Sequence, residues 1–522
     1  MRLTPSRAQR TARAAHSPRR TPHKPRTAHK PRRTPHKPRA SHQLCCRPVT
    51  NRAAPPHAAP PTSPRTAPAA NAQRASHVKA SMRASHVSRR AIRAVLISLI
   101  AAVAALAAAP FSNEHARGQD RSAPDAGLPD RGPIIDIDAP ERALYKIAVP
   151  QLLGDSGLGT QGAEVVRNDL KLVSLFTILD PRSFLADPSR EGLGITAAAW
   201  SSVGAQGIVK GQITGSGSAL SIEMRFYELA RGTTATLTKT YRGGPGELRG
   251  FMHDFANEIL RVLTGEAGAF GTRFTFGRRV GPGRKDVYVA DFDGASVGRI
   301  SSGRGVAMLP AFGPGGVWYS VLTKRGMFIT RSGRNEEPVI AGDGMNMGVT
   351  FCGSRALFSS TRDGNSEIYS SAADGSDVRR LTRHPGIDVS PACGPGGQVA
   401  FVSDRNGGPQ IFVMDASGGG ARRVTFRGNH NQTPAWCPVA GKNLLAFTGR
   451  DSGMDIFTVD VATQQYTRIT QGQGTNKDPA FSPDCRMIAF SSTRGGIFLS
   501  NPEGQNQNLV VPGGAETIRW SR

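Results

Sequence analysis

The chain has 522 residues, and its 66 Lys and Arg against 39 Asp and Glu give a formal net charge of +27 at pH 7. Residues 1–93 hold 22 of the basic residues and no acidic one, which leaves 44 basic and 39 acidic residues, or about +5, in the rest. The composition therefore excludes a strongly basic body of the kind that binds nucleic acid. The 60 Gly residues exceed the usual ~7% and favour a turn-rich β protein.

Residues 1–81 form a low-complexity basic tail. The segments TPHKPR and RASHV each occur twice before residue 88, and Pro, Arg, His and Ala dominate the composition. Such a stretch has too few apolar residues to bury a core. We expect the mature protein to lack the tail, because translation starts at Met82 or because processing removes it. The alternative is a basic arm that binds nucleic acid or anionic lipid.

Residues 82–109 have the pattern of a signal peptide. Four Arg between positions 83 and 93 precede an apolar run over residues 94–109, and Ala105-Leu106-Ala107 satisfies the A-x-A cleavage rule. The run is shorter than the ~20 residues that span a bilayer comfortably, so a cleaved signal is favoured over a retained anchor. We expect an exported protein that begins near residue 110, with a disordered lead-in over residues 110–133.

Residues 134–265 predict a small α/β domain. A closing amphipathic helix is the clearest element, because its apolar residues recur at steps of three and four and Gly265 follows as a C-cap. Thr196 is the expected N-cap of a short helix. A further helix is predicted over residues 164–173, and strands are predicted at 134–137, 144–149, 175–179, 208–213, 221–229 and 234–241.

Residues 266–522 contain six repeats of about 40–45 residues. Equivalent strands rich in β-branched and aromatic residues begin at Val287, Met327, Ile368, Ile411, Ile456 and Ile497. Four short antiparallel strands per repeat, arranged radially, are typical of a β-propeller with WD40-like repeats. The predicted fold class is therefore mainly β, with a six-bladed β-propeller preceded by the small α/β domain.

The two ends of the propeller predict how its ring closes. The first repeat lacks its innermost strand, and residues 516–522 match that strand in pattern. We expect the C-terminal segment to complete blade 1, because this pairing removes two otherwise open sheet edges.

Four cysteines lie beyond the tail, which itself holds Cys45 and Cys46. They are Cys352, Cys393, Cys437 and Cys485. The first three share the position after the innermost strand with Gly313, Ser482 and Ser521. No C-x-x-C pair or zinc-ligand spacing is present. Small-residue packing near the axis is the leading interpretation. A disulfide between neighbouring blades is the alternative, although three cysteines in one column cannot all pair with one another.

Several motifs resemble catalytic or metal sites without meeting their requirements. The G-x-S-x-G at residues 294–298 is expected in a turn between blade strands, whereas a hydrolase needs a strand-to-helix elbow. Two Asp-rich turns, around Gly294 and Gly375, suggest calcium loops but lack the full ligand spacing, and Asp-Gly is ordinary in hairpins. His115, His253, His384 and His430 are scattered, and we expect them in exposed loops. The predictions are no catalytic residue, no metal, no cofactor and no enzyme activity.

A binding surface is the more plausible function. Propellers bind partners at the mouth of the central channel. The loops that enter the innermost strands should form one mouth, which we call the entry mouth; they are residues 345–348, 384–390, 429–433, 475–478 and 516–517. Their polar side chains and Gly suit an extended peptide or loop, although ordinary solvated turns are the alternative. The candidate partner-binding residues are His384, Asp388, Ser390, Asn431, Gln432, Thr433, Lys477 and Asp478.

Over residues 134–522 the chain resembles the TolB family of the Tol-Pal system of Gram-negative bacteria. The first domain carries AAWSSVGAQGIVKGQI at 198–213 and LTGEAGAFGTRF at 263–274. The propeller carries FSSTRDGNSEIY at 358–369, NQTPAWCP at 431–438 and PAFSPD at 479–484. Blade repeats are shared with many propellers, and their combination with this first domain and an export signal is more specific.

The resemblance implies a monomeric, non-catalytic periplasmic adaptor that supports outer-membrane integrity and invagination during cell division. Its partners would be the outer-membrane lipoprotein Pal, at the propeller mouth, and the inner-membrane protein TolA, at the N-terminal segment of the mature chain. His384 and Thr433 lie in loops like those that meet Pal. The TolA contact would fall on Ile134, Ile135, Asp136 and Ile137.

Two rival functions use the same fold. One is the non-catalytic propeller of a prolyl oligopeptidase-like peptidase, which predicts a hydrolase domain downstream; we expect none. The other is an exported propeller that binds a sugar or another small ligand. A capture experiment with Pal distinguishes the adaptor from both.

Overall fold

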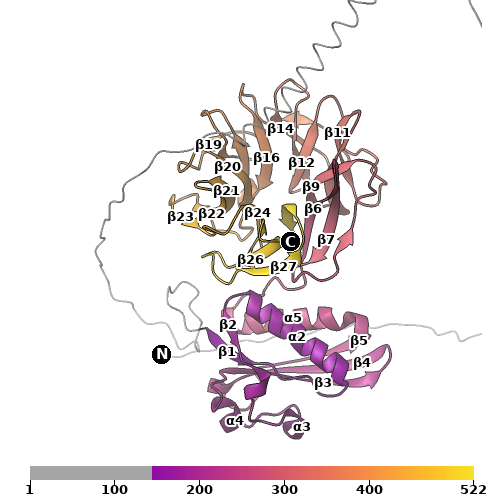
Figure 1. Cartoon of the computed structure of the whole chain (residues 1–522), viewed down its shortest axis with the longest axis vertical. Coiled ribbons are helices and arrows are strands. Elements are labelled where there is room, and N and C mark those ends of the chain that lie inside the picture. The colour runs from indigo at the N-terminus through magenta and orange to yellow at the C-terminus, as the bar shows by residue number, and fades with distance from the viewer. Residues whose placement is uncertain (1–143, 522) are drawn as a thin grey trace, which may run out of the picture. The chain divides into compact units, whose positions relative to one another are not determined.

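The computed structural model describes residues 144–521 (Figure 1). The predicted tail, signal peptide, lead-in and strand at 134–137 lie outside the described residues. Within residues 144–521, no helix is both long and apolar enough to cross a membrane.

The α/β domain is built on one five-stranded sheet with the order β2-β1-β3-β4-β5. Strand β1 pairs in parallel with β2 and β3, and β3, β4 and β5 form an antiparallel meander. The strands are β1 (Tyr145–Ala148), β2 (Phe176–Ile178), β3 (Gly207–Ser216), β4 (Ala219–Glu228) and β5 (Leu237–Gly243). The short α3 (Pro188–Glu191) and α4 (Ala197–Ser201) lie between β2 and β3, and the latter begins after Thr196 as predicted.

The helices α2 (Ser156–Leu172) and α5 (Leu248–Thr264) lie side by side (Figure 1) and bury one face each in a shared core. Helix α5 has the predicted amphipathic pattern and ends at Gly265 in the left-handed conformation, with φ of 81°. Helix α2 begins eight residues before the predicted helix, because Asp155 caps it by accepting a hydrogen bond from Leu158 N at 2.8 Å. Its first turns contain Gly159 and Gly162, which obscure the helical pattern in the sequence.

The propeller consists of six antiparallel sheets, which confirms the predicted six-bladed fold (Figure 1). Blade 1 contains β28 (Glu516–Trp520), β6 (Arg273–Gly281), β7 (Arg284–Asp291) and β8 (Gly298–Arg299). Blade 2 contains β9 (Val306–Gly313), β10 (Gly316–Thr323) and β11 (Gly326–Arg331). Blade 3 contains β12 (Asn346–Cys352), β13 (Arg355–Ser360), β14 (Glu367–Ser371) and β15 (Arg379–Arg380).

The remaining blades follow the same order from the axis outward. Blade 4 contains β16 (Asp388–Cys393), β17 (Val399–Ser403), β18 (Gln410–Met414) and β19 (Arg422–Arg423). Blade 5 contains β20 (Asn431–Trp436), β21 (Leu444–Arg450), β22 (Met454–Asp460) and β23 (Tyr466–Arg468). Blade 6 contains β24 (Asn476–Phe481), β25 (Ile488–Ser492), β26 (Gly496–Ser500) and β27 (Asn508–Pro512). Blade 2 departs from the predicted four strands, because a single bridge between Ile329 and Ile340 stands in place of its outermost strand.

The C-terminal strand closes the ring as predicted. Strand β28 pairs with β6, so that Trp520 lies opposite Phe274 and their ring centroids are 4.6 Å apart. Ser521 N donates a hydrogen bond to Arg273 O at 2.8 Å, and Trp520 Nε1 donates to Thr272 Oγ1 at 2.7 Å. The first and last strands of the propeller thus share one sheet.

Two disulfides join neighbouring blades. Cys352 pairs with Cys393 between blades 3 and 4, and Cys437 pairs with Cys485 between blades 5 and 6. Small-residue packing is therefore the wrong interpretation for the cysteines, and the alternative of a disulfide between blades is confirmed. The partner of Cys437 is Cys485, which does not occupy the position after an innermost strand that the other three cysteines share. It lies in the turn after β24, where the other repeats have no cysteine.

Candidate functional site

Each innermost strand of the propeller carries one residue in the left-handed conformation near its start. These six residues have φ between 52° and 69°, and each lies at a register shift in the ladder to the next strand. They are Leu309, Gly348, Ser390, Thr433, Asp478 and Thr517. Non-glycine residues rarely adopt this conformation, and such bulges re-aim side chains at the rims of β structures. The bulge residues therefore define the entry mouth of the channel.

Hydrogen bonds between blades hold four of these bulges. Gly348 N donates to Ser320 Oγ at 3.0 Å, and Ser390 N donates to Ser359 Oγ at 3.2 Å. Asp478 N donates to Thr448 Oγ1 at 3.0 Å. In the last of the four, Thr517 N donates to the Asp478 carboxylate at 2.8 Å. Each acceptor belongs to the preceding blade, so the entry mouth is a cross-linked ring.

The mouth loop of blade 4, residues 384–387, is fixed by its neighbours. Asn365 Nδ2 donates to the carbonyl oxygens of His384 and Gly386 at 2.6 and 2.7 Å. Ile387 N donates to Asp404 Oδ1 at 2.6 Å, and Gly386 N donates to His384 Nδ1 at 2.9 Å. The loop is thus held in one shape, which lowers the entropic cost of binding a partner.

Two of the predicted partner-binding residues lie inside the blades. Asp388 has no exposed surface, and its carboxylate accepts a hydrogen bond from Arg405 Nη2 at 2.8 Å. Burial raises the pKa of the Asp388 carboxyl, and the bonds from Ser403 and Arg405 oppose this only in part. Asn431 is also buried, and its Nδ2 donates to Gln410 Oε1 at 2.9 Å. Both side chains support the mouth from within rather than face a partner.

The other predicted residues of blades 5 and 6 are brought together around their bulges. Gln432, Thr433 and Lys477 are half-buried, and Asp478 is buried. Thr433 Oγ1 lies 2.7 Å from Thr448 Oγ1, the same hydroxyl that receives Asp478 N. Burial raises the pKa of the Asp478 carboxyl, although the hydrogen bond from Thr517 N opposes it.

Two exposed apolar side chains were missed by the sequence reasoning, one in the entry mouth and one on the approach to it, beside the outermost strand β23 (Tyr466–Arg468). Ile387 is 40% exposed in the blade 4 loop, and Phe426 is 61% exposed in the loop that leads to β20. The Phe426 backbone is held in place, because its N donates to Tyr466 Oη at 2.9 Å. Exposed apolar groups on a rigid rim are the usual anchors of a protein interface. Both residues lie in the connection from the outermost strand of one blade to the innermost strand of the next. An apolar residue in such a connection was the sequence signal that could have identified them.

A group of potential metal ligands lies away from the channel, where α2, α5 and the turn after β7 meet. Single ligand atoms of Asp169, His253 and Asp293 all lie within 4.8 Å of one another. His253 Nδ1 is 2.7 Å from Asp169 Oδ2, and Arg249 forms an ion pair with Asp293. Each carboxylate of the group therefore already has a nitrogen partner within the protein. His253 is buried, which corrects the expectation that it lies in an exposed loop.

The G-x-S-x-G motif lies in the hairpin turn between β7 and β8, as predicted. Ser296 is exposed and adopts a φ of 53°. A side chain on Gly294 would approach Val510 O to 1.8 Å, so a close contact with blade 6 requires this glycine. The Asp residues of the second suspected calcium turn are also engaged: Asp374 accepts from Ser376, and Asp377 pairs with Arg355 and Arg379.

Comparison with known proteins assigns both parts of the chain. The family model described as the TolB amino-terminal domain matches residues 133–235, and the model described as the TolB beta propeller domain matches residues 260–453. A crystal structure of TolB from Acinetobacter baumannii superposes with a TM-score of 0.63 at 24% identity and covers 73% of this chain and 97% of that chain. At that identity the likeness shows the fold alone.

Curated relatives support the same family. The Tol-Pal system protein TolB of Anaeromyxobacter dehalogenans is 37% identical over 290 residues, which cover 52% of this chain and 64% of the relative. The TolB homolog of Chlorobium chlorochromatii is 33% identical over 247 residues, which cover 46% of this chain and 56% of the relative. The chain thus matches less than two thirds of the length of each of these relatives. With its amino-terminal domain and its propeller both matching, the chain belongs to the TolB family.

Proposed function

We propose that this protein is a non-catalytic adaptor of the Tol-Pal system in the periplasm, and that it binds the lipoprotein Pal at the entry mouth. The rigid mouth with its exposed Ile387 and Phe426 is the observation that carries the proposal. Membership of the TolB family supports a role in the Tol-Pal system. The entry mouth offers a surface that suits a folded or extended protein partner.

The chemistry of the entry mouth favours a protein partner. His384, Thr433 and Lys477 are half-buried polar groups around the apolar anchors. Interfaces commonly join an apolar centre to a polar rim in this way. Ser390 and Thr433 are held at left-handed bulges, so their positions are set before a partner arrives. The candidate catalytic motif, by contrast, is an exposed hairpin turn.

We propose further that Ile134, Ile135, Asp136 and Ile137 carry a contact with TolA. The matched amino-terminal family region begins at residue 133 and so includes this segment. Its alternation of apolar and acidic residues suits the addition of an extended strand to a partner's sheet edge. Through the two contacts the adaptor would link outer-membrane integrity to invagination during cell division.

The two disulfides support a periplasmic location. Disulfides persist in oxidising compartments such as the bacterial periplasm, and both of these are placed between blades where reduction would weaken the ring. The predicted signal peptide over residues 82–109 is consistent with export to that compartment.

Capture of Pal by the purified full chain tests the proposal. Wild-type protein is expected to bind Pal with a Kd of ~1 µM or tighter. Ile387→Ala and Phe426→Ala should each weaken binding about tenfold, because each truncates an exposed apolar anchor without touching the core. A complete failure of capture at these concentrations would overturn the adaptor function.

A matched control separates the mouth from the rest of the surface. Val297 is 43% exposed on the β7–β8 turn, away from the mouth loops. Val297→Ala should bind Pal as tightly as wild type. Equal weakening by all three substitutions, or wild-type affinity in both mouth variants, would remove the assignment of the entry mouth.

A further inference from the structure

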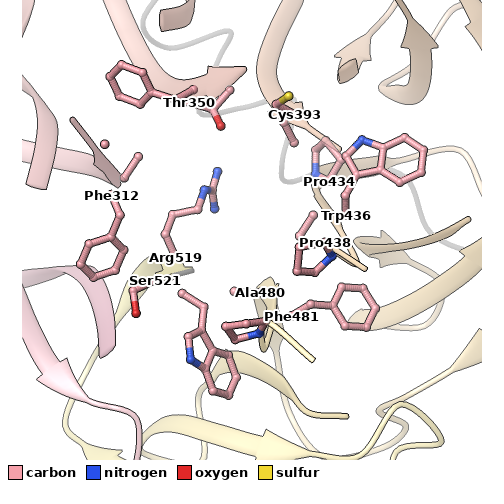
Figure 2. A pocket seen from close by; sticks show the side chains of 17 residues that line it. Phe312, Thr350, Cys393, Pro434, Trp436, Pro438, Ala480, Phe481, Arg519 and Ser521 are labelled. Atoms are coloured by element: carbon pink, nitrogen blue, oxygen red, sulfur yellow. The ribbon is translucent and has the colours of Figure 1, made fainter. Parts of the chain in front are cut away.

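The end of the channel opposite the entry mouth holds a cavity of about 400 Å³ (Figure 2). We call it the exit cavity. Its walls are the C-terminal halves of the innermost strands, which contribute mainly apolar side chains. Among these, Phe312, Trp436, Phe481 and Trp520 supply aromatic rings, and Pro434 and Pro438 supply flat apolar surface. The volume is within the range of small-molecule sites, ~300–1,000 Å³.

One charged side chain enters this apolar space. Arg519 extends from β28 across the cavity toward Thr350, whose hydroxyl faces it (Figure 2). Arg519 also lines the small cavity beneath the entry mouth, beside Gly348 and Ser390. Arg519 is half-buried, and it lies within the channel between these two cavities.

Arg519 has little to offset its charge. Its Nη1 donates a hydrogen bond to the backbone oxygen of Ile518, at 2.9 Å. Among residues 144–521, no carboxylate oxygen lies within ion-pair distance of the guanidinium. A guanidinium offers five N–H donors, and those without a protein acceptor are available to a ligand in the cavity. Burial lowers the pKa of Arg519.

The charged groups that face Arg519 do not neutralise it. Asp478 on β24 is the acidic residue that acts on it electrostatically, but its carboxylate already receives Thr517 N at 2.8 Å. Lys477 is half-buried next to Asp478 and adds a second positive charge. Asp478 therefore offsets the charge of Arg519 only in part.

We propose that the exit cavity binds an organic carboxylate, with the carboxylate on the Arg519 guanidinium and an apolar body against the surrounding rings. The guanidinium can take both oxygens of a carboxylate through two parallel hydrogen bonds, and Thr350 can donate a third. The aromatic and proline walls favour an apolar body over a hydrated inorganic ion. The carboxylate can belong to a free small molecule or to the C-terminus of a peptide. This site is independent of Pal binding at the entry mouth.

Binding to the full chain tests the proposal with two pairs of probes. The first pair is benzoate and its neutral isostere benzamide. The second is the dipeptide acetyl-Ala-Phe with a free C-terminus and the same dipeptide as its amide. Titration calorimetry and tryptophan fluorescence report binding, because Trp436 and Trp520 line the cavity. At least one carboxylate should bind with a Kd of ~1 mM or tighter, and its neutral counterpart should bind about tenfold more weakly. Whichever carboxylate binds more tightly identifies the source.

Arginine variants give the decisive comparison. Arg519→Gln should lose the preference for carboxylate over amide, and Arg519→Lys should retain part of it, since a lysine keeps the charge but not the paired donors. Arg422→Gln, which removes an exposed arginine from the outer strand β19, should bind as wild type does. Thermal unfolding of Arg519→Gln without ligand should occur at or above the wild-type temperature, because an uncompensated charge is removed.

Three results would overturn the proposal. The first is no saturable binding of either carboxylate, and the second is equal affinity for a carboxylate and its amide. The third is an Arg519→Gln protein that melts as wild type does and still prefers the carboxylate. Loss of Pal capture alone leaves the exit cavity unaffected, so the two proposals fail separately.

Discussion

At the scale of single residues, the buried pair of Asp169 and His253 stands out because folding raises the pKa of both groups. Burial raises the pKa of the Asp169 carboxyl to about 6, and the hydrogen bond and charge of His253 lower it only in part. Burial lowers the pKa of His253, but the hydrogen bond and charge of Asp169 outweigh it and raise the pKa above its usual value. The charge of Asp293 raises the pKa of both groups, and the charge of Arg249 lowers it.

The pair predicts a pH dependence of stability. Because both folded pKa values are raised, the folded state binds more protons here than the unfolded chain does. The contribution of Asp169 is full below pH ~4 and is lost as the pH rises through about 6, and that of His253 is lost from pH ~6.5 upward. We expect the stability of wild type relative to the double variant Asp169→Asn/His253→Gln to fall between pH 5 and 8 by on the order of 1–2 kcal/mol.

Urea unfolding at several pH values measures this difference, and His430→Gln is the control. Burial lowers the pKa of His430, with the bond from Gln432 opposing it, so the folded state binds protons less readily at this residue. The stability that wild type has relative to His430→Gln should therefore rise with pH, with a slope of opposite sign. Parallel profiles of wild type and the double variant would show that the pair does not titrate in this range.

Residue-level features of the mouth were the least accessible to sequence reasoning. Of the six bulge residues, only Gly348 and Asp478 have residue types that are enriched in the left-handed conformation. Hydrogen bonds to the preceding blade hold Ser390 and Thr517 in that conformation, and no local pattern records such contacts. Asp388 was predicted to meet a partner because it lies in the mouth loop 384–390, yet Arg405 compensates its charge inside the blade.

At the scale of elements, periodicity located the strands and helix α5 well, whereas glycines hid the start of α2. A side chain at Gly159 would approach Leu152 O to 2.3 Å, and one at Gly162 would approach Leu152 Cδ1 to 2.7 Å. Both glycines are thus required by the close approach of the segment before the helix. Helix propensity penalises glycine, so the same residues that allow the packing remove the helical signal.

Disulfide pairing likewise depends on contacts between elements, which explains why the sequence left it open. Each bridge joins an innermost-strand position of one blade to the next blade, across 41 and 48 residues of chain. Closing a loop of this length lowers the entropy of the unfolded chain by an amount worth about 4 kcal/mol at 25 °C. The bridges therefore stabilise the packing of neighbouring blades against each other more than the fold of a single blade.

The Cys352–Cys393 bridge gives a direct prediction. The double variant Cys352→Ser/Cys393→Ser should lose on the order of 2–5 kcal/mol of unfolding free energy. Denaturant unfolding without reductant measures the loss, and the same experiment with reductant is the control. Under reducing conditions wild type should fall toward the variant, because both then lack this crosslink. A wild-type protein whose stability is insensitive to reductant would contradict the assignment.

At the scale of the whole molecule, the repeat carried most of the predictable information. Six similar units of nearly constant length predict a radial array, and the unit with a missing strand predicts which end completes it. The same logic did not reach the channel, because the side chains that meet there come from all six blades. Arg519 illustrates this point: its strand was predicted, but the lack of an ion-pair partner for it among residues 144–521 depends on what the other five blades place around it.

Ring closure makes the propeller's stability depend on its last strand. Strand β28 contributes Ile518, which has no exposed surface, and Trp520, which is 8% exposed. Deleting residues 516–522 removes both, leaves the inner edge of β6 unpaired and uncovers β24 of blade 6, so we expect a large fall in melting temperature. Ile518→Ala, a smaller change, should cost about 2–5 kcal/mol. Leu509→Ala, on the exposed outer strand β27, should stay within ~0.5 kcal/mol of wild type. An unchanged melting temperature after the deletion would refute closure by the C-terminus.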